Sequence, residues 1–183
     1  MKESTQHKHN LVHTSMRLFR RQGYASTGLQ QILAESGAPK GSLYYYFPSG
    51  KEGLAEAAVE MAANLICETL ADLARRYPEP KQFIVAYCDV VAGWMEESDF
   101  RSGCPIATTM LETAPQSPVL TKAGEAAMDR WIGQISAVFE GSEMDAEQAY
   151  KEAELVVAAI EGALIISRIR RSSAPIRQLA QLL

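Results

Sequence analysis

The chain has 183 residues, of which 47% are hydrophobic and 22% charged, and its formal net charge is -4. The 12 glycines and 8 prolines follow no period, which excludes collagen-like and low-complexity chains. No stretch reaches the roughly 18 uninterrupted apolar residues of a membrane span, and the N-terminus lacks the apolar core of a secretory signal, so we expect a soluble cytoplasmic protein.

Three N-terminal segments have the periodicity of helices. The first spans about residues 8–22. The second spans 27–37 and opens with a capping box, in which Thr27 is followed three residues later by Gln30. The third spans 39–47 and ends because a proline follows it. Two short helices that flank a tight turn are the arrangement of a helix-turn-helix motif.

The rest of the chain is predicted to be helical as well, because it contains no alternating strand patterns. The expected helices, in chain order, are 50–76, 81–97, 105–113, 118–139, 145–171 and 175–183. We therefore predict an all-α fold, with a helix-turn-helix domain in residues 1–48 and a helical-bundle domain for ligand binding and dimerisation in residues 49–183.

The charges are distributed unevenly. Residues 1–51 contain seven Lys and Arg against two acids, a net charge of +5, whereas residues 52–183 contain 11 against 20, a net charge of -9. A basic module joined to an acidic body is typical of a protein that binds nucleic acid through the module alone.

The third segment has the side chains that such a module needs. Leu43 and Phe47 lie four residues apart and are expected to face inward, which leaves polar and aromatic residues on the remaining circumference. A lysine neutralises phosphate, hydroxyls donate to phosphate oxygens, and tyrosine rings pack on thymine methyl groups. The segment is therefore predicted to enter the major groove of DNA.

Residues 11–54 resemble the signature of the TetR/AcrR family of transcriptional regulators. The matching residues are Phe19, Tyr24, Thr27, Ile32, Gly37, Gly41-Ser42-Leu43-Tyr44-Tyr45-Tyr46-Phe47, Lys51-Glu52 and Leu54. A second similarity, to the LmrA/YxaF-like branch, lies in Gly103-Cys104-Pro105-Ile106-Ala107, Glu112 and Arg130-Trp131.

This resemblance implies a homodimer that reads double-stranded operator DNA and binds a small-molecule effector. Thr27 and Lys51, each at the start of a helix, would hold phosphate, which helix N-termini also favour. The recognition surface would consist of Pro39, Lys40, Gly41, Ser42, Tyr44, Tyr45 and Tyr46. An alternative assigns Thr27 to helix capping alone and Tyr44 to packing.

The segment 155–169 is apolar around nearly its whole circumference, so it must be covered on two sides. A chain of this size is expected to cover the second side with a copy of itself, through an isologous contact. The predicted interface residues are Val156, Ile160, Ala163, Leu164 and Ser167.

An effector pocket between helices needs adaptable apolar side chains, and the candidates are Tyr87, Trp94, Met110 and Trp131. No cofactor motif is present, and no metal site is expected, because His9 and His13 have only His7 nearby as a third ligand. The three cysteines are too widely spaced for a zinc site and are expected to be free thiols.

The sequence thus predicts a transcriptional repressor that a small hydrophobic or amphipathic ligand releases from a palindromic operator. It predicts no enzyme, since every histidine lies before residue 18 and no catalytic set can be assembled. Two alternatives stay open. One is a redox-responsive regulator that senses through Cys104 at a helix start, and the other is a dimeric small-molecule carrier that does not read DNA.

Overall fold

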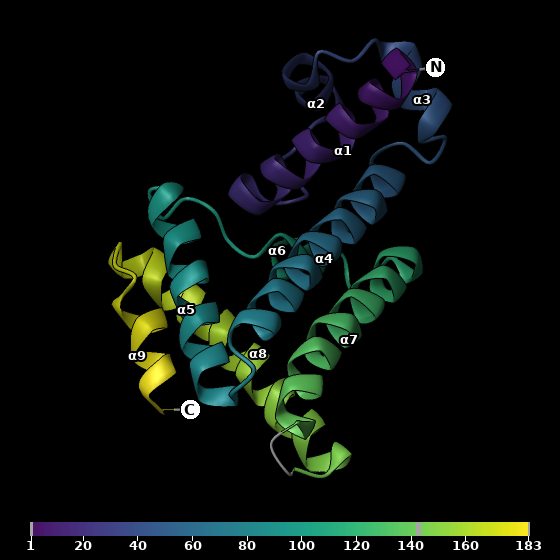
Figure 1. The fold of residues 1–183 in the computed structure, drawn as a ribbon. Helices are drawn as coiled ribbons and strands as arrows, with labels where there is room; N and C mark the ends of the chain where they lie inside the picture. The colour runs from purple at the N-terminus through teal and green to yellow at the C-terminus, as the bar shows by residue number, and fades with distance from the viewer. Residues whose placement is uncertain (1, 142–143, 183) are drawn as a thin grey trace. The chain divides into compact units, whose positions relative to one another are not determined.

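The structure is a computed structural model that describes residues 2–141 and 144–182. In this part of the chain it contains nine helices and no strand, which confirms the predicted all-α fold (Figure 1). The helices are α1 (Lys2–Gln22), α2 (Leu29–Ser36), α3 (Lys40–Tyr46), α4 (Lys51–Arg76), α5 (Pro80–Glu97), α6 (Pro105–Thr113), α7 (Pro118–Glu140), α8 (Ala146–Arg170) and α9 (Ala174–Leu182).

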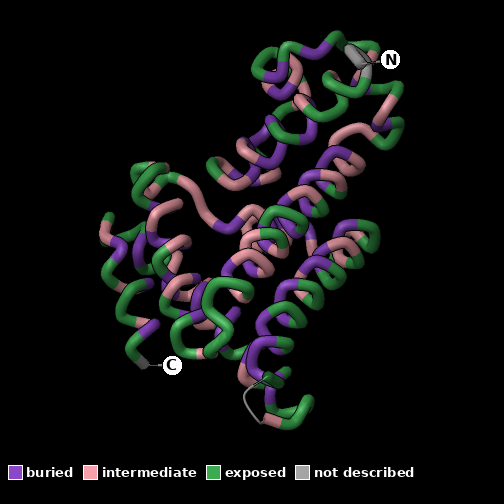
Figure 2. Tube along the Cα trace, in the orientation of Figure 1, coloured by how far each residue is buried: buried purple, intermediate pink, exposed green. Residues whose placement is uncertain are grey.

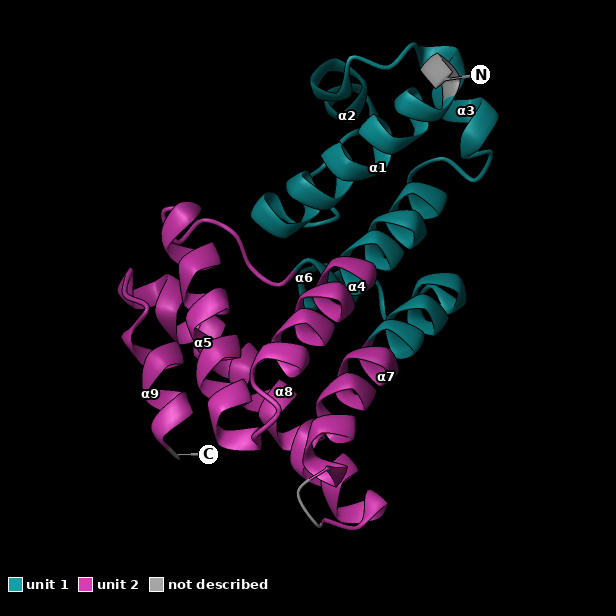
Figure 3. Ribbon diagram, viewed as in Figure 1, with its two compact units in different colours: residues 1–63, 105–127 teal, residues 64–104, 128–183 magenta. Residues whose placement is uncertain are grey.

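The chain forms two compact units, which Figure 3 shows in different colours. Unit 1 comprises residues 1–63 and 105–127, and unit 2 comprises residues 64–104 and 128–183. Two helices, α4 and α7, contribute to both units. The units are defined by packing, and the predicted functional boundary between residues 48 and 49 remains a prediction.

In unit 1, α1 packs against α2, α3 and α6. The buried side chains of Leu11, Phe19, Ile32 and Leu43 form the core between the N-terminal helices, and Figure 2 shows how buried and exposed positions alternate along the helices. Both α1 and α2 are followed by a glycine at positive φ, a conformation that costs other residues free energy. The glycines therefore end both helices.

The predicted capping box at the start of α2 is wrong. The helix begins at Leu29 with Gly28 in the cap position and no side-chain cap. The Thr27 hydroxyl instead donates a hydrogen bond of 2.7 Å to the carbonyl oxygen of Gly23, and Thr27 is fully buried. A buried hydroxyl needs a partner, and the preceding turn supplies one.

In unit 2, α9 packs against α5 and α8, and α5 also packs against α8. Two of these helices begin with an acidic cap: Glu79 accepts hydrogen bonds from backbone N–H groups at the start of α5, and Asp145 does so at the start of α8. Phe83, Tyr87 and Trp131 are among the largest fully buried side chains of this unit.

The predicted dimer-interface residues lie on the face of α8 that packs within the chain. Val156, Ile160, Ala163 and Ser167 are buried within the chain, and Leu164 is half-buried. The apolar side chains that α8 leaves exposed are Leu155, Ile165, Ile166 and Ile169. The helix is apolar on both faces, so the sequence pattern did not distinguish the face that packs inside the chain from the face that remains uncovered.

Within residues 2–141 and 144–182, no helix combines the length and the apolarity that crossing a membrane would require.

Candidate nucleic-acid interface

Helix α3 is held by two buried side chains and presents the rest of its surface to solvent. Leu43 and Phe47 are buried, as their spacing predicted. Tyr45 is 78% exposed and Tyr44 is 52% exposed, which disfavours the alternative that Tyr44 is mainly a packing residue. The remaining predicted recognition residues are exposed or half-buried: Pro39, Lys40, Gly41, Ser42 and Tyr46.

The polar face of α3 is partly preorganised. The rings of Tyr45 and Tyr46 pack edge to face, with centroids 4.8 Å apart. Pro39 occupies the cap position of α3 in an extended conformation, so it fixes the direction in which the chain enters the helix. One lysine and three tyrosines thus share an accessible helix surface, which suits contact with phosphates and base edges.

The two predicted phosphate contacts, Thr27 and Lys51, differ in how far they are exposed to solvent. The Thr27 side chain is fully buried and its hydroxyl is used within the chain, so the side chain is not placed to hold phosphate. Lys51, the first residue of α4, is half-buried: its Nζ donates to the carbonyl oxygen of Ala25 at 3.4 Å and lies 4.3 Å from the centre of the Tyr24 ring. Partial burial lowers the pKa of the Lys51 ammonium group, and the charge of Glu112 opposes this change.

Glu112 on α6 is a further functional candidate. The sequence indicates it only as part of the similarity to the LmrA/YxaF-like branch and assigns it no role. Its Oε2 accepts a hydrogen bond of 2.5 Å from the backbone N–H of Ala25. A Cβ at Gly23, where φ is +88°, would collide with the same carboxylate. Glu112 and Lys51 therefore both hold the turn between α1 and α2. Glu112 accepts from the N–H of Ala25, and Lys51 donates to the C=O of Ala25.

A second link ties the start of α4 to the turn before α7. Ser117 Oγ donates a hydrogen bond of 2.6 Å to Oε1 of Glu52. All of these groups belong to unit 1, so α6 and the first half of α7 form one packed body with the helix-turn-helix.

The predicted effector residues are divided between the two units. Met110 belongs to unit 1, where it packs on Gly124 so closely that a Cβ at that position would collide with its sulfur. Trp94 is half-buried in α5. Tyr87 and Trp131, from α5 and α7, are buried in unit 2 and lie close enough for the indole to influence the pKa of the phenol.

Four residues of unit 2 form what we call the core polar cluster: Tyr87, Cys104, Trp131 and Glu161. Burial raises the pKa of Tyr87 well above its ordinary value, and the neighbouring acids Cys104 and Glu161 raise it further. Burial also raises the pKa of the Glu161 carboxyl, against a hydrogen bond from Cys104 that lowers it. Glu161 was missed, although a single acid in the apolar segment 155–169 was a signal for it.

None of the three cysteines forms a disulfide. Cys88 and Cys104 are buried, and burial raises the pKa of Cys88 to about 11. The Cys104 thiol is buried and hydrogen-bonded to Glu161, so it lacks the exposure that reactive cysteines need. The structure therefore does not favour Cys104 as a redox sensor.

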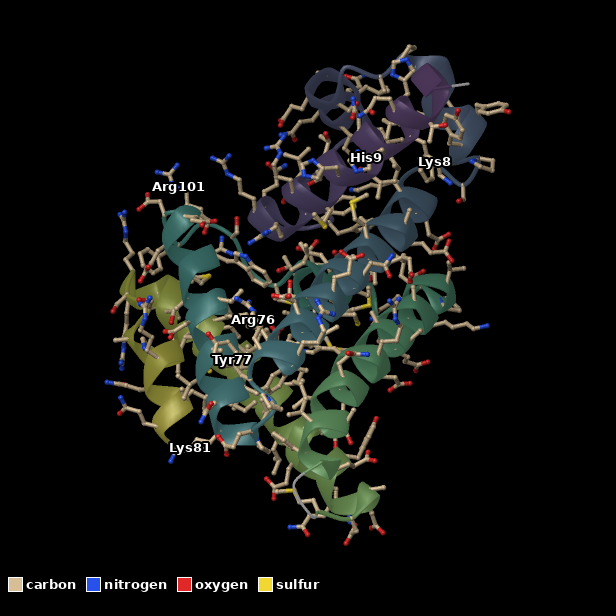
Figure 4. The ribbon with its side chains drawn as sticks, viewed as in Figure 1. Lys8, His9, Arg76, Tyr77, Lys81 and Arg101 are labelled. Carbon is tan, nitrogen blue, oxygen red and sulfur yellow. The ribbon has the colours of Figure 1, made fainter. Side chains whose placement is uncertain are left out.

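The side chains of His9 and His13 are exposed on α1. His9 projects from the exposed side of α1 (Figure 4), and its ring stacks on that of His13 with centroids 6.0 Å apart. In the part of the chain that the structure describes, no group of three or more His, Cys, Asp or Glu side chains is arranged to hold a metal ion.

Comparison with known proteins gives two family matches. The model of bacterial regulatory proteins of the tetR family matches residues 11–58, and the model of the transcriptional regulator LmrA/YxaF-like C-terminal domain matches residues 80–182. The HTH-type transcriptional regulator LmrA of Bacillus subtilis is 32% identical over 169 residues, which cover 92% of this chain and 90% of that protein. YxaF of the same organism, also an HTH-type transcriptional regulator, is 30% identical over 174 residues, which cover 95% and 91%.

The fold is shared with solved structures. The regulatory protein TetR from Rhodobacter sphaeroides superposes with a TM-score of 0.85 at 20% identity, over 95% of each chain.

Proposed function

Because the chain belongs to the TetR family of bacterial DNA-binding transcriptional regulators, with an LmrA/YxaF-like C-terminal domain, we propose that it is a homodimeric repressor that a small hydrophobic or amphipathic effector releases from a palindromic operator. The membership rules out the alternative of a carrier that does not read DNA. The proposal includes a cytoplasmic location, no enzymatic activity and no cofactor.

The exposed polar face of α3 is the observation that carries the proposal. Lys40, Tyr44 and Tyr45 are exposed on a short helix whose opposite side is buried through Leu43 and Phe47. A soluble helix gains nothing in stability from two tyrosines in water, whereas a DNA groove would cover both rings. We assign base contacts to this face and phosphate contacts to Lys40 and Lys51.

The exposed apolar stripe of α8 supports the homodimer. Leu155, Ile165, Ile166 and Ile169 recur at helical spacing, so they share one side of α8. Large apolar patches on a monomer mark interaction surfaces. A two-fold contact through this stripe would cover the same residues on both copies, and we propose it in place of the buried face that the sequence suggested.

Release by an effector requires a change in the distance between the helix-turn-helix motifs of the two copies. Recognition helices of a dimer enter successive major grooves only when they lie about 34–36 Å apart, or a multiple of that distance. Helix α4 belongs to both units, and Cys104 of the core polar cluster directly precedes Pro105 at the start of α6, which carries Glu112. An effector that prefers the splayed state would therefore act on the helix-turn-helix through these two connections and through α7, which also belongs to both units.

A purified transcription assay tests the repressor proposal. A duplex selected by the protein from random sequences is placed over a promoter, and transcription is measured as protein is added. We expect transcription to fall with the wild type and to stay unchanged with Tyr45→Ala. Tyr77→Ala, which removes an exposed tyrosine directly after the end of α4, is the matched control and should repress normally. Increased transcription would identify an activator instead.

A further inference from the structure

We propose that the DNA interface extends beyond α3 to a phosphate site that we define by three side chains of unit 1: Lys8 in α1, Tyr46 at the end of α3 and Ser49 in the turn before α4. Its ligand is a phosphodiester group of the DNA backbone. This inference rests on the DNA-reading role proposed above for α3 and adds a contact that fixes where this helix lies along the duplex.

The phosphate site is one end of a groove on the surface of unit 1. The groove has a volume of about 750 Å³ and is lined by Lys8, by the residues that join α3 to α4, and by side chains of α4 and α7. Its residues from α4 begin with Gly53 in the first turn and continue to Glu60, so the groove runs along α4 away from α3. Tyr46 and Ser49 therefore lie at the end next to α3.

Lys8 reaches the same end of the groove from α1. Helix α1 packs against α3, and Figure 1 shows the N-terminal part of α1 beside that helix. The Lys8 side chain is exposed on this part of α1 (Figure 4) and lines the groove together with Tyr46. A duplex that receives α3 in its major groove carries a phosphate backbone past each side of the helix. The ammonium group of Lys8 is placed to neutralise one of these phosphates.

Two hydroxyl groups complete the phosphate site. Ser49 is exposed, and Tyr46, at the last position of α3, is half-buried with its ring packed edge to face on Tyr45. A Cβ at Gly53 would lie 2.5 Å from Ser49 Oγ, so the glycine leaves room for the hydroxyl against the first turn of α4. Serine and tyrosine hydroxyls donate to phosphate oxygens. The site thus combines one positive charge with two donors, which suits a phosphate.

The charges along the groove confine a phosphate to this end. Glu56 and Glu60 line the groove from α4, and both are exposed. At 1.5 Å per residue they lie about 8 and about 14 Å along the helix from Lys51. Carboxylates repel a phosphate, so this acidic stretch keeps the DNA backbone away from the rest of the groove. Charge complementarity with DNA is therefore limited to the end that Lys8 occupies.

The dependence of DNA binding on salt counts the phosphate contacts. Each contact contributes about 0.9 to the slope of log K against log salt concentration. Lys8→Gln should therefore lower this slope by about 0.9 and, if the affinities converge at about 1 M salt, weaken binding about eightfold at about 0.1 M. Lys8→Arg keeps the charge and should keep the slope. The loss should be equal on the duplex that the wild type selects from random sequences and on a scrambled duplex, because phosphate contacts carry no sequence information.

Lys122→Gln is the matched control, because it removes the same charge from the same groove. Ser117, directly before α7, binds Glu52 in the first turn of α4. Lys122 lies further along α7, which runs alongside α4 in Figure 1. It therefore faces the acidic stretch and not the end next to α3, and its replacement should leave the slope unchanged.

A neutral backbone identifies the partner of Lys8 as a DNA phosphate. Methylphosphonates placed one at a time in the selected duplex remove single negative charges. We expect one position in each half-site to weaken the wild type about eightfold at about 0.1 M salt. The same substitution should leave Lys8→Gln unaffected, since this variant has already lost the contact.

The inference is overturned if Lys8→Gln keeps the wild-type slope, if it behaves like Lys122→Gln, or if every methylphosphonate affects the wild type and Lys8→Gln alike. Each of these results is compatible with selection of a palindrome by the wild type, so it refutes this inference alone. A wild type that selects no sequence refutes the proposed function instead, and the scrambled duplex then still tests the contact of Lys8.

Discussion

Replacing Ile169 by aspartate should separate the proposed dimer. Ile169 is 77% exposed in the single chain. Complete burial of an isoleucine side chain contributes about 1.5–3 kcal/mol, so covering this fraction contributes about 1–2 kcal/mol per copy and about 2–4 kcal/mol per two-fold dimer. Losing it weakens association roughly 30- to 1,000-fold, and burial of the new carboxylate adds to the loss.

Sedimentation velocity over a concentration series measures this dissociation constant. Leu111→Asp is the matched control, because Leu111 is equally exposed but lies on α6 of unit 1, and it should leave the constant unchanged. Ile160→Val probes the buried face of α8: it should lower the stability of the fold by about 0.5–1.5 kcal/mol without a specific effect on association. A wild-type dissociation constant for Ile169→Asp, or greater weakening by Ile160→Val, would refute the exposed stripe as the interface.

Three further outcomes concern single side chains. Gly23→Ala should destabilise the fold by about 1–3 kcal/mol, because φ is positive and the new Cβ collides with the Glu112 carboxylate. In thermal unfolding, the double variant with Glu112→Ala should recover the part of this stability loss that the collision causes. If the destabilisations of the two single variants simply add in the double variant, the contact is contradicted. Thr27→Val should cost about 1 kcal/mol of stability but leave the salt dependence of DNA binding unchanged, since the hydroxyl is used inside the chain; a smaller salt slope would restore Thr27 as a phosphate contact. Burial raises the pKa of Glu161 in the folded protein, so wild-type stability should fall as pH rises above the ordinary value of 4.5 and through the pKa of the folded state. Glu161→Gln should therefore be the more stable protein at neutral pH and lose this advantage in acid, and denaturant titrations that show a constant difference would contradict the burial of the carboxyl.

The exposed face of α3 could be predicted because its signal is local. The spacing of Leu43 and Phe47 fixes which side of α3 faces inward, and the polar residues between them then lie outside. At Thr27 the same local reasoning failed, since the capping pattern was present but the hydroxyl donates to the carbonyl oxygen of Gly23 instead.

Features that depend on residues far apart in the sequence were harder to predict. Segment 155–169 is apolar on both faces, so only packing within the chain distinguishes the buried Ile160 from the exposed Ile169. Glu112 meets a backbone N–H that lies 87 residues earlier, and Glu161 meets a thiol from another segment. The hydrophobic periodicity of the sequence does not indicate which distant residues such side chains contact.

Selection from random duplexes at rising salt measures whether a dimer reads DNA through α3. We expect sequencing of the retained DNA to recover a palindrome whose half-sites are separated by one helical turn or a multiple, and Tyr45→Ala to lose this preference while keeping salt-sensitive binding. Retention without any sequence preference by the wild type, or the same palindrome recovered by Tyr45→Ala, would contradict the proposed role of α3.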